Sequence, residues 1–137
     1  MTRVQKAARI FGWIFIVLAV LGFLWSGGSL ESDVAQAPHA LGLFAVNVWH
    51  NLFHLASGIW GLVAARRYTS ARTYTRVLGV VYLALFVLGF FLPDLFGIMP
   101  IGGNDIWLHL LLGVGLAYFG FTARARAVET PAERRAA

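Results

Sequence analysis

The sequence predicts an all-α membrane protein, a bundle of four transmembrane helices built from two pseudo-symmetric helical hairpins. Three observations predict this fold: the apolar composition, four long apolar stretches, and a pattern of glycine and histidine positions that recurs in both halves of the chain. Of the 137 residues, 59% are hydrophobic and only 12% are charged, whereas about 25% of the residues of an ordinary soluble domain are charged. Because a chain this short has too little interior to hide so much apolar surface, we expect it to lie in lipid.

Each apolar stretch is expected to form one helix that crosses the membrane. The stretches occupy about residues 10–25, 41–65, 77–92 and 106–123. A crossing takes about 20 residues, which the two shorter stretches reach with flanking residues, and a helix satisfies its own backbone hydrogen bonds in lipid. We expect a single domain of residues 1–127, followed by a disordered cytoplasmic tail at 128–137.

The basic residues predict the orientation of these helices. All 11 Lys and Arg residues precede the first stretch, join the second to the third, or follow the fourth. The segments 26–40 and 93–105, on the other side, contain no basic residue and hold four of the six acidic residues. Since basic residues favour the cytoplasmic side, we expect both termini in the cytoplasm. The net charge of +5 then indicates topology and contact with the lipid bilayer, and no nucleic-acid partner is expected.

The two halves of the chain repeat one another. In the first helix of each half, the equivalent residues are 67 positions apart: Gly12 and Gly79, Gly22 and Gly89. In the second helix of each half they are 55 positions apart: His50 and Asp105, His54 and His109, Gly58 and Gly113. Because both hairpins begin on the same side, we expect a pseudo-twofold axis along the membrane normal, across which the second and fourth helices face each other. The glycines are expected to let helix backbones approach closely.

Four ionisable side chains are predicted to form a metal site in the outer half of the bilayer. His50 and His54 lie four residues apart on the second helix. Asp105 and His109 have the same spacing on the fourth helix, so each pair shares one helical face. Three imidazoles and a carboxylate suit a divalent transition metal such as zinc. We therefore predict that these four side chains bind one ion where the pseudo-twofold axis brings the two pairs together.

Other interpretations of the same residues stay open. His54 and His109 occupy equivalent positions, so they are also candidates for the two axial ligands of one b-type haem. Gly58 and Gly113, four residues further on, would then leave room for the porphyrin. An ion held by three histidines would also suit hydrolysis, with Asp105 orienting the attacking water. Whether the protein is an enzyme is left open by these patterns.

Asn47 and Asn51 lie beside the histidines and are expected to support the ligands by hydrogen bonds. In a different interpretation, the polar side chains of this region only hydrogen-bond to neighbouring helices, and Asp105 caps the start of the fourth helix. The protein would then be a non-catalytic structural or accessory subunit that associates with another membrane protein or with itself.

A resemblance to a known family rests on the same region. The segment 42–58 contains a pattern made of Asn47, His50, Asn51 and His54. Together with residues 76–82 and 104–109, this segment resembles a family of small actinobacterial and cyanobacterial membrane proteins known as a domain of unknown function. The similarity covers about residues 8–123. It implies a four-helix protein of the bacterial plasma membrane and brings no activity, substrate or cofactor with it.

Overall fold

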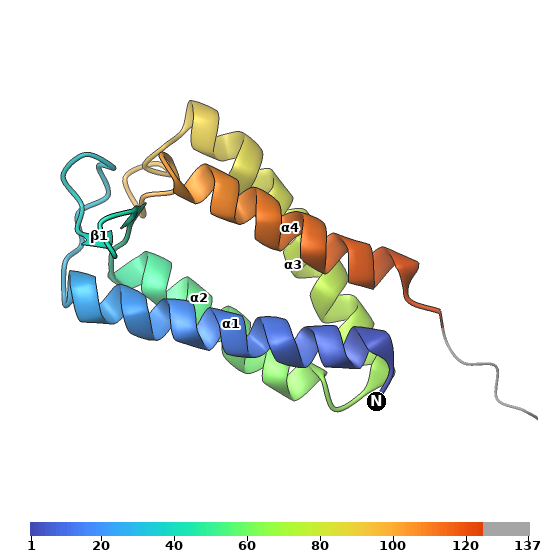
Figure 1. Ribbon diagram of the computed structural model, residues 1–137. Coiled ribbons are helices and arrows are strands. Elements are labelled where there is room, and N and C mark those ends of the chain that lie inside the picture. Colours follow the sequence, from blue (N-terminus) through green and yellow to red (C-terminus); the bar gives the residue numbers. More distant parts are fainter. Residues whose placement is uncertain (125–137) are drawn as a thin grey trace, which may run out of the picture.

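The computed structural model describes residues 1–124 of the chain. This part contains four helices: α1 Arg3–Ser26, α2 Val48–Ala64, α3 Tyr68–Phe91 and α4 Asp105–Thr122. In the loop between α1 and α2, two short strands pair antiparallel: β1 His39–Ala40 and β2 Phe44–Ala45. Successive helices run in opposite directions, and the two long loops gather at one end of the molecule (Figure 1). The tail predicted at 128–137 lies outside the described residues.

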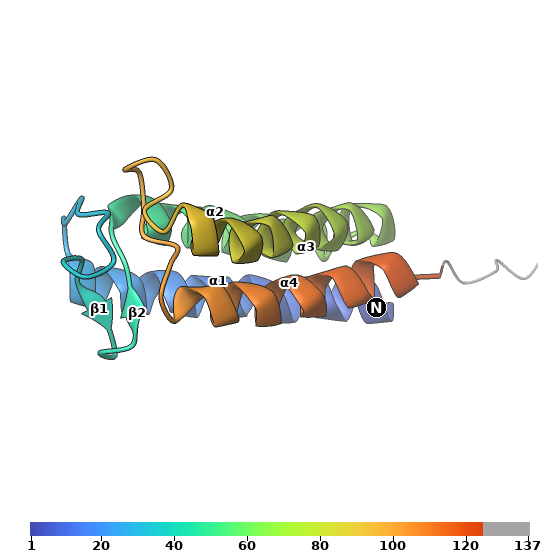
Figure 2. The same cartoon turned by 90° about the horizontal axis from the view of Figure 1, so that it is seen from above.

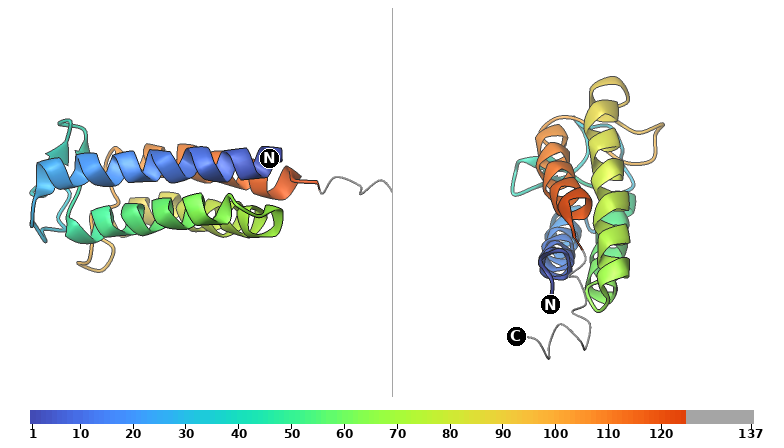
Figure 3. Two further views of the ribbon diagram at one scale, coloured as in Figure 1. Left: turned by 90° about the horizontal axis from the view of Figure 1, so that it is seen from below. Right: turned by 90° about the vertical axis from the view of Figure 1, so that its right-hand side faces the viewer.

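The helices are arranged as two hairpins, α1 with α2 and α3 with α4, which lie side by side. The most extensive helix contacts are those within each hairpin. Seen from above, α2 and α3 lie in one layer and α1 and α4 in the other (Figure 2). The N-terminus and the end of α4 lie at the same end as the short connection between α2 and α3 (Figure 3). At the centre, the rings of Phe15 and Tyr82 join the two hairpins, with 5.0 Å between ring centroids.

Three of these helices have the length and composition of membrane spans. The helices α1 and α3, with 24 residues each, and α4, with 18, are long and apolar enough to cross a membrane. Apolar side chains cover their outer surface, and Leu24, Phe91 and Leu111 are each more than 70% exposed. The helix α2 has 17 residues, which corresponds to about 25 Å of helix. The expectation of a helical chain with membrane-like helices is thus confirmed for three of the four.

The stretch predicted as helical at 41–65 is helical only from Val48 onward. Leu41 and Gly42 have positive φ angles of 54° and 71°, and this conformation turns the chain between β1 and β2 instead of continuing a helix. Asn47 then caps α2, because its side-chain oxygen accepts a hydrogen bond of 2.9 Å from the backbone N–H of the third helical residue. The all-α prediction therefore missed this small hairpin, of which Ala40 and Ala45 are buried.

The other helix boundaries differ mainly at the basic end of the molecule. The helices α1 and α3 begin before the apolar stretches predicted at 10–25 and 77–92. Thr2 and Gln5 form a capping box that starts α1 among polar residues. The helix α4 lies within one residue of the predicted stretch 106–123 at each end. Hydropathy alone marks the apolar part of a helix and not its polar first turns.

Close backbone contacts hold each hairpin together at glycine positions. A Cβ atom at Gly12 of α1 would lie 2.9 Å from the backbone nitrogen of Leu62 in α2. A Cβ atom at Gly79 of α3 would lie 2.6 Å from the backbone nitrogen of Ala117 in α4. Any side chain at either position would collide with the neighbouring backbone, so these glycines set the distance between the paired helices.

Candidate metal centre

The helix α2 turns its polar residues inward and its apolar residues outward. His50, His54 and Ser57 follow one another at helical spacing and are all buried. On the opposite face, Trp49 and Ile59 are each 53% exposed. This distribution is the reverse of that in a soluble protein and brings the histidines of α2 into the space between the helices.

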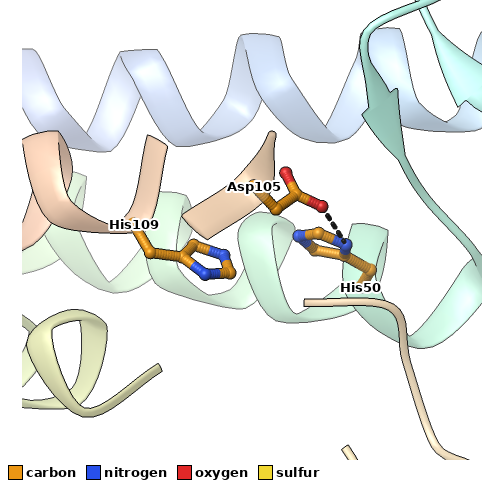
Figure 4. Close-up of side chains that lie close together, drawn as sticks. All are labelled: His50, Asp105 and His109. Carbon is orange, nitrogen blue, oxygen red and sulfur yellow. Dashed lines mark ion pairs between the residues drawn. The ribbon is translucent and has the colours of Figure 1, made fainter. Parts of the chain in front are cut away.

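The first turn of α4 supplies the other two predicted ligands. Asp105 is the first residue of α4 and His109 lies one turn further on, and each is 1% exposed. Both side chains point toward His50 (Figure 4). The distance from His50 Nδ1 to Asp105 Oδ2 is 3.7 Å. One nitrogen or oxygen atom from each of these three side chains lies within 4.8 Å of the others, which brings residues 55 positions apart in sequence into one cluster.

The fourth predicted ligand, His54, lies beside this cluster and is not one of its three members. Its ring centroid is 4.6 Å from that of His50. The His54 ring also contacts Phe15, with 5.8 Å between centroids, and stacks on Tyr82 at 6.4 Å. The four side chains therefore divide into a compact group of three and a histidine one helical turn deeper.

Most polar atoms of these side chains have no hydrogen-bond partner among the described residues. The atoms concerned are both ring nitrogens of His50 and of His54, both carboxyl oxygens of Asp105, and Nδ1 of His109. Each unsatisfied buried polar group costs about 1–3 kcal/mol, and most such groups in native proteins have a partner. The backbone carbonyl groups of Ala45 and Pro100 lie near the His50 ring, but their geometry is not that of a hydrogen bond. A cation between the side chains would give one nitrogen of each imidazole and the carboxyl group of Asp105 a common partner.

The two long loops cover the end of the bundle at which the cluster lies. The first loop contributes the buried residues Ala45 and Val46, and the second contributes Met99 and Ile101. Two amide side chains join the loops: Asn47 Nδ2 donates to the carbonyl oxygen of Ile98 at 2.9 Å, and Asn104 Nδ2 donates to that of Leu43 at 3.0 Å. These hydrogen bonds join the two loops, which shield the cluster from solvent at this end of the molecule.

Neither asparagine predicted to support the ligands reaches an imidazole nitrogen within the described residues. Asn47 instead caps α2 and bonds to the second loop. Asn51 donates a hydrogen bond of 2.7 Å to Ser26 Oγ. Its side chain fills the space left by Gly22. Both asparagines therefore hold the helix that carries the histidines, whereas the sequence predicts that they support the ligands by hydrogen bonds.

The expectation that Asp105 caps α4 is also corrected. The residue before the helix is Asn104, which makes no side-chain capping bond and whose amide nitrogen donates to the first loop. The two oxygens of the Asp105 carboxyl group have no hydrogen-bond partner within residues 1–124. Asp105 therefore lies inside the first turn with its carboxyl group directed to the cluster.

Tyr82 of α3 is a central residue that the sequence interpretation missed. Its side chain is fully buried. Its ring stacks on that of His54 and meets that of His109 edge to face, with 5.6 Å between centroids. A signal for it was present in the sequence, because Tyr82 lies 67 positions after Phe15, which is the offset of the predicted repeat.

The glycines expected to leave room for a porphyrin are in contact with neighbouring helices. A Cβ atom at Gly58 would lie 2.8 Å from the side chain of Ile16. A Cβ atom at Gly113 would lie 2.9 Å from the side chain and backbone of Leu83. These glycines therefore serve helix contact, and the space beside each is occupied by the neighbouring helix.

Comparison with known proteins places the chain in a family. No curated protein and no solved structure matches it. The family model described as "Domain of unknown function (DUF4383)" matches residues 5–122. This match spans most of the chain, including both hairpins and every member of the cluster, and confirms the expected membership of an uncharacterised family. The chain belongs to the DUF4383 family of domains of unknown function.

Proposed function

We propose that this protein is a membrane protein that binds one divalent transition-metal ion, zinc in the first instance, between α2 and α4. The observation that carries the proposal is the cluster of His50, Asp105 and His109, whose ligand atoms lie within 4.8 Å of one another. Ligand atoms bonded to one tetrahedral zinc ion lie about 3.3 Å apart, given Zn–N and Zn–O distances of about 2.0–2.1 Å. The proposal requires the side chains to rotate and close this difference when the ion binds.

His54 is the fourth ligand in this proposal. Its ring is adjacent to that of His50, and neither of its nitrogens has a hydrogen-bond partner within the described part of the chain. Four protein ligands form a closed site, which is typical of an ion that stabilises a fold or is stored, whereas catalytic zinc keeps a position open for water. The proposed function is therefore ion binding and not hydrolysis.

The proposal places the cluster in the outer half of a bacterial plasma membrane, with four crossings and both termini in the cytoplasm. The fourth crossing would be α2, which has 17 residues and is the shortest of the four helices. Its apolar outer face supports this crossing. Charge supports the orientation: within residues 1–124, the acidic side chains all belong to the long loops or the first turn of α4, at the loop end. The basic side chains of the same residues lie at the opposite end.

We also propose that the two hairpins arose from one by duplication, so that the cluster lies on a pseudo-twofold axis. The helix contacts support this, because three glycine contacts of the first hairpin have counterparts in the second at the sequence offsets of 67 and 55. The corresponding contacts are Gly12–Leu62 and Gly79–Ala117, Gly58–Ile16 and Gly113–Leu83, and Gly22–Asn51 and Gly89–Ile106.

The metal content of the purified protein tests the proposed function. The full chain in neutral detergent, incubated with zinc and dialysed, is expected to retain about one zinc per chain by elemental analysis. His109→Ala and His50→Ala are expected to lose affinity by more than about 100-fold, the upper end of the loss caused by removing a mere supporting partner. His39→Ala is the matched control, because His39 lies in the β-hairpin outside the cluster. Zinc content that is zero in the parent protein, or equal in all variants, would contradict the proposal.

Two further outcomes decide between this proposal and its alternatives. A strong Soret band in the purified protein, lost in His54→Ala and His109→Ala, would establish the b-type haem instead of the ion. Absence of both metal and haem would leave a structural or accessory subunit. In that case His109→Leu is expected to preserve or raise thermal stability. If the protein binds zinc, the same variant is expected to be less stable than the parent protein in the presence of zinc, because a ligand that binds the folded state stabilises it by mass action.

A further inference from the structure

A second candidate site lies at the end of the molecule opposite the metal centre. A cavity of about 740 Å³ opens there between the start of α1, the start of α3 and the end of α4. The cavity is lined by residues 1–6, Tyr68, Tyr118, Phe119 and residues 122–124. The short connection between α2 and α3 lies at the same end (Figure 3).

The lining of this cavity is positively charged. Three of its side chains are cationic, namely Arg3, Lys6 and Arg124, and none is acidic among the residues that the structure describes. None of the three cations lies within 4.0 Å of a carboxylate in residues 1–124. The hydroxyl of Tyr68, also in the lining, is buried and has no hydrogen-bond partner in the same residues. The cavity thus offers three cations and is complementary to an anion.

An apolar groove continues from the cavity along the outside of the helices. Its volume is about 190 Å³, and it shares Arg3, Lys6 and Phe119 with the cavity. The rest of its lining comes from α1 and is apolar: Ala7, Ile10 and Phe11. From Arg3 to Ile10 the helix rises by about 10 Å. The basic cavity and the apolar groove therefore form one continuous surface with a charged end and a hydrocarbon end.

We propose that this surface binds an anionic phospholipid. The phosphate group lies among Arg3, Lys6 and Arg124, and one acyl chain lies in the groove. Basic pockets between transmembrane helices on the cytoplasmic side bind such head groups. A soluble phosphate compound would use the cavity but leave the groove empty, so the groove favours a lipid. The inference rests on the membrane orientation proposed above and is independent of the metal centre.

Binding of defined lipids to the full chain in neutral detergent tests this assignment. Native mass spectrometry or thermal shift is expected to show binding of dioleoylphosphatidylglycerol and much weaker binding of dioleoylphosphatidylcholine. The double variant Arg3→Gln/Lys6→Gln is expected to bind phosphatidylglycerol about 25-fold more weakly, at about fivefold for each basic side chain. The matched control is Arg66→Gln/Arg67→Gln, which removes the same charge at the same end but outside the cavity, and it is expected to keep the affinity. An equal loss in both double variants would overturn the site.

The groove has its own pair of variants. Ile10 lies in the groove and is 57% exposed, whereas Val17 lies seven residues further on the same helical face, outside the groove, and is 53% exposed. Ile10→Ser is expected to weaken lipid binding several-fold and Val17→Ser to leave it unchanged. Glycerol 1-phosphate that bound as tightly as the lipid would overturn the lipid assignment. A tenfold or greater gain in affinity for phosphatidylglycerol in the double variant Glu129→Gln/Glu133→Gln would also overturn the lipid assignment. The occupant of the cavity would then be the chain's own carboxylates.

Discussion

The two hairpins of this protein are alike where their helices touch. In the first, Gly12 of α1 meets the backbone of α2 at Leu62, and in the second, Gly79 of α3 meets the backbone of α4 at Ala117. Both glycines occupy the same place in their hairpin, 67 positions apart in sequence. Small residues at these points keep the paired helices close in a medium that supplies no hydrophobic force between them. Helix contact is therefore the feature that the two halves share.

The hairpins differ at the interior points where they meet. His50 in the first corresponds to Asp105 in the second, and Phe15 corresponds to Tyr82. His54 and His109 remain alike. Two identical hairpins would bring together either four histidines or two histidine–aspartate pairs. The difference between the halves instead produces three imidazoles and a single carboxylate, a mixed set that suits zinc and carries only one negative charge.

A third difference concerns the side chain that lies against a glycine between the two helices of each hairpin. Gly22 in the first hairpin faces Asn51, whose amide bonds to Ser26 Oγ at 2.7 Å. Gly89 in the second faces the side chain of Ile106 and the backbone carbonyl of Ile101. A hydrogen-bonded amide side chain thus lies against the glycine in one half, and an aliphatic side chain lies there in the other.

Exchanging the two differing ligands tests whether the halves are interchangeable, and we expect this to have the largest effect. His50→Asp alone puts a second carboxyl group beside Asp105, which already lies 3.7 Å from His50. Leaving a charge without a partner inside a protein costs about 3–5 kcal/mol, and zinc binding is expected to be lost. The double variant His50→Asp/Asp105→His restores one carboxylate and three imidazoles and is expected to regain most of the stability and the ion. The measurement is a double-mutant cycle of unfolding in detergent, with zinc content.

The control for this exchange is His39→Asp, which adds the same carboxylate in the β-hairpin, away from the cluster. It is expected to retain zinc. If the loss of unfolding free energy in the double variant equals or exceeds the sum of the losses in the two single variants, the two positions are not equivalent. The proposed axis would then not describe the site.

The shared glycine contacts give the next largest effect. Gly12→Ala and Gly79→Ala each place a methyl group within 2.9 Å of a facing backbone atom, and overpacking of this kind costs about 1–3 kcal/mol. We expect similar losses in both hairpins, measured as the free energy of unfolding in detergent micelles. Gly28→Ala is the control, because a Cβ atom there meets nothing within 4 Å in the described residues. A loss in one hairpin only would indicate that helix contact, too, differs between the halves.

Asn51→Ile makes the first hairpin resemble the second at the third point of difference. The variant removes the bond to Ser26, and hydrogen bonds between membrane helices contribute about 0.6 kcal/mol on average. We expect stability to fall by about that amount and zinc content to stay unchanged, since the Asn51 amide does not bond to a ligand within residues 1–124. A loss of zinc in this variant would instead assign Asn51 the supporting role that its place in the sequence suggested.

Tyr82→Phe gives the second hairpin the aromatic residue of the first and is expected to have the smallest effect. The hydroxyl of Tyr82 has no hydrogen-bond partner within the described chain, so its removal breaks no hydrogen bond and is expected to leave or raise stability. Zinc content is expected to stay at the level of the parent protein. A fall in zinc content would show that the hydroxyl takes part in the site through a bound water or the ion.

Much of the fold was predictable because it follows from local properties. Hydropathy and length located the apolar parts of α1, α3 and α4. The family resemblance is confirmed. The spacing of four residues between His50 and His54 predicted that both lie on one helix face, and that face is buried. The start of α2 was wrong by seven residues, at Val48 in place of residue 41, because an apolar stretch does not reveal a turn with positive φ. Hydropathy is equally high in a helix and in an apolar loop that folds over the end of a bundle.

The sequence by itself determined which side chains are polar, which helix face carries them, and which end of the molecule is basic. These are properties of composition and of the helical period, and they do not depend on distant residues. Only the tertiary structure decided that His50, Asp105 and His109 form one group while His54 lies beside it, and that Asn51 bonds to α1. Distances between helices depend on how closely the backbones approach at glycines and on how the two loops hold the ends together, and neither is encoded in a single segment.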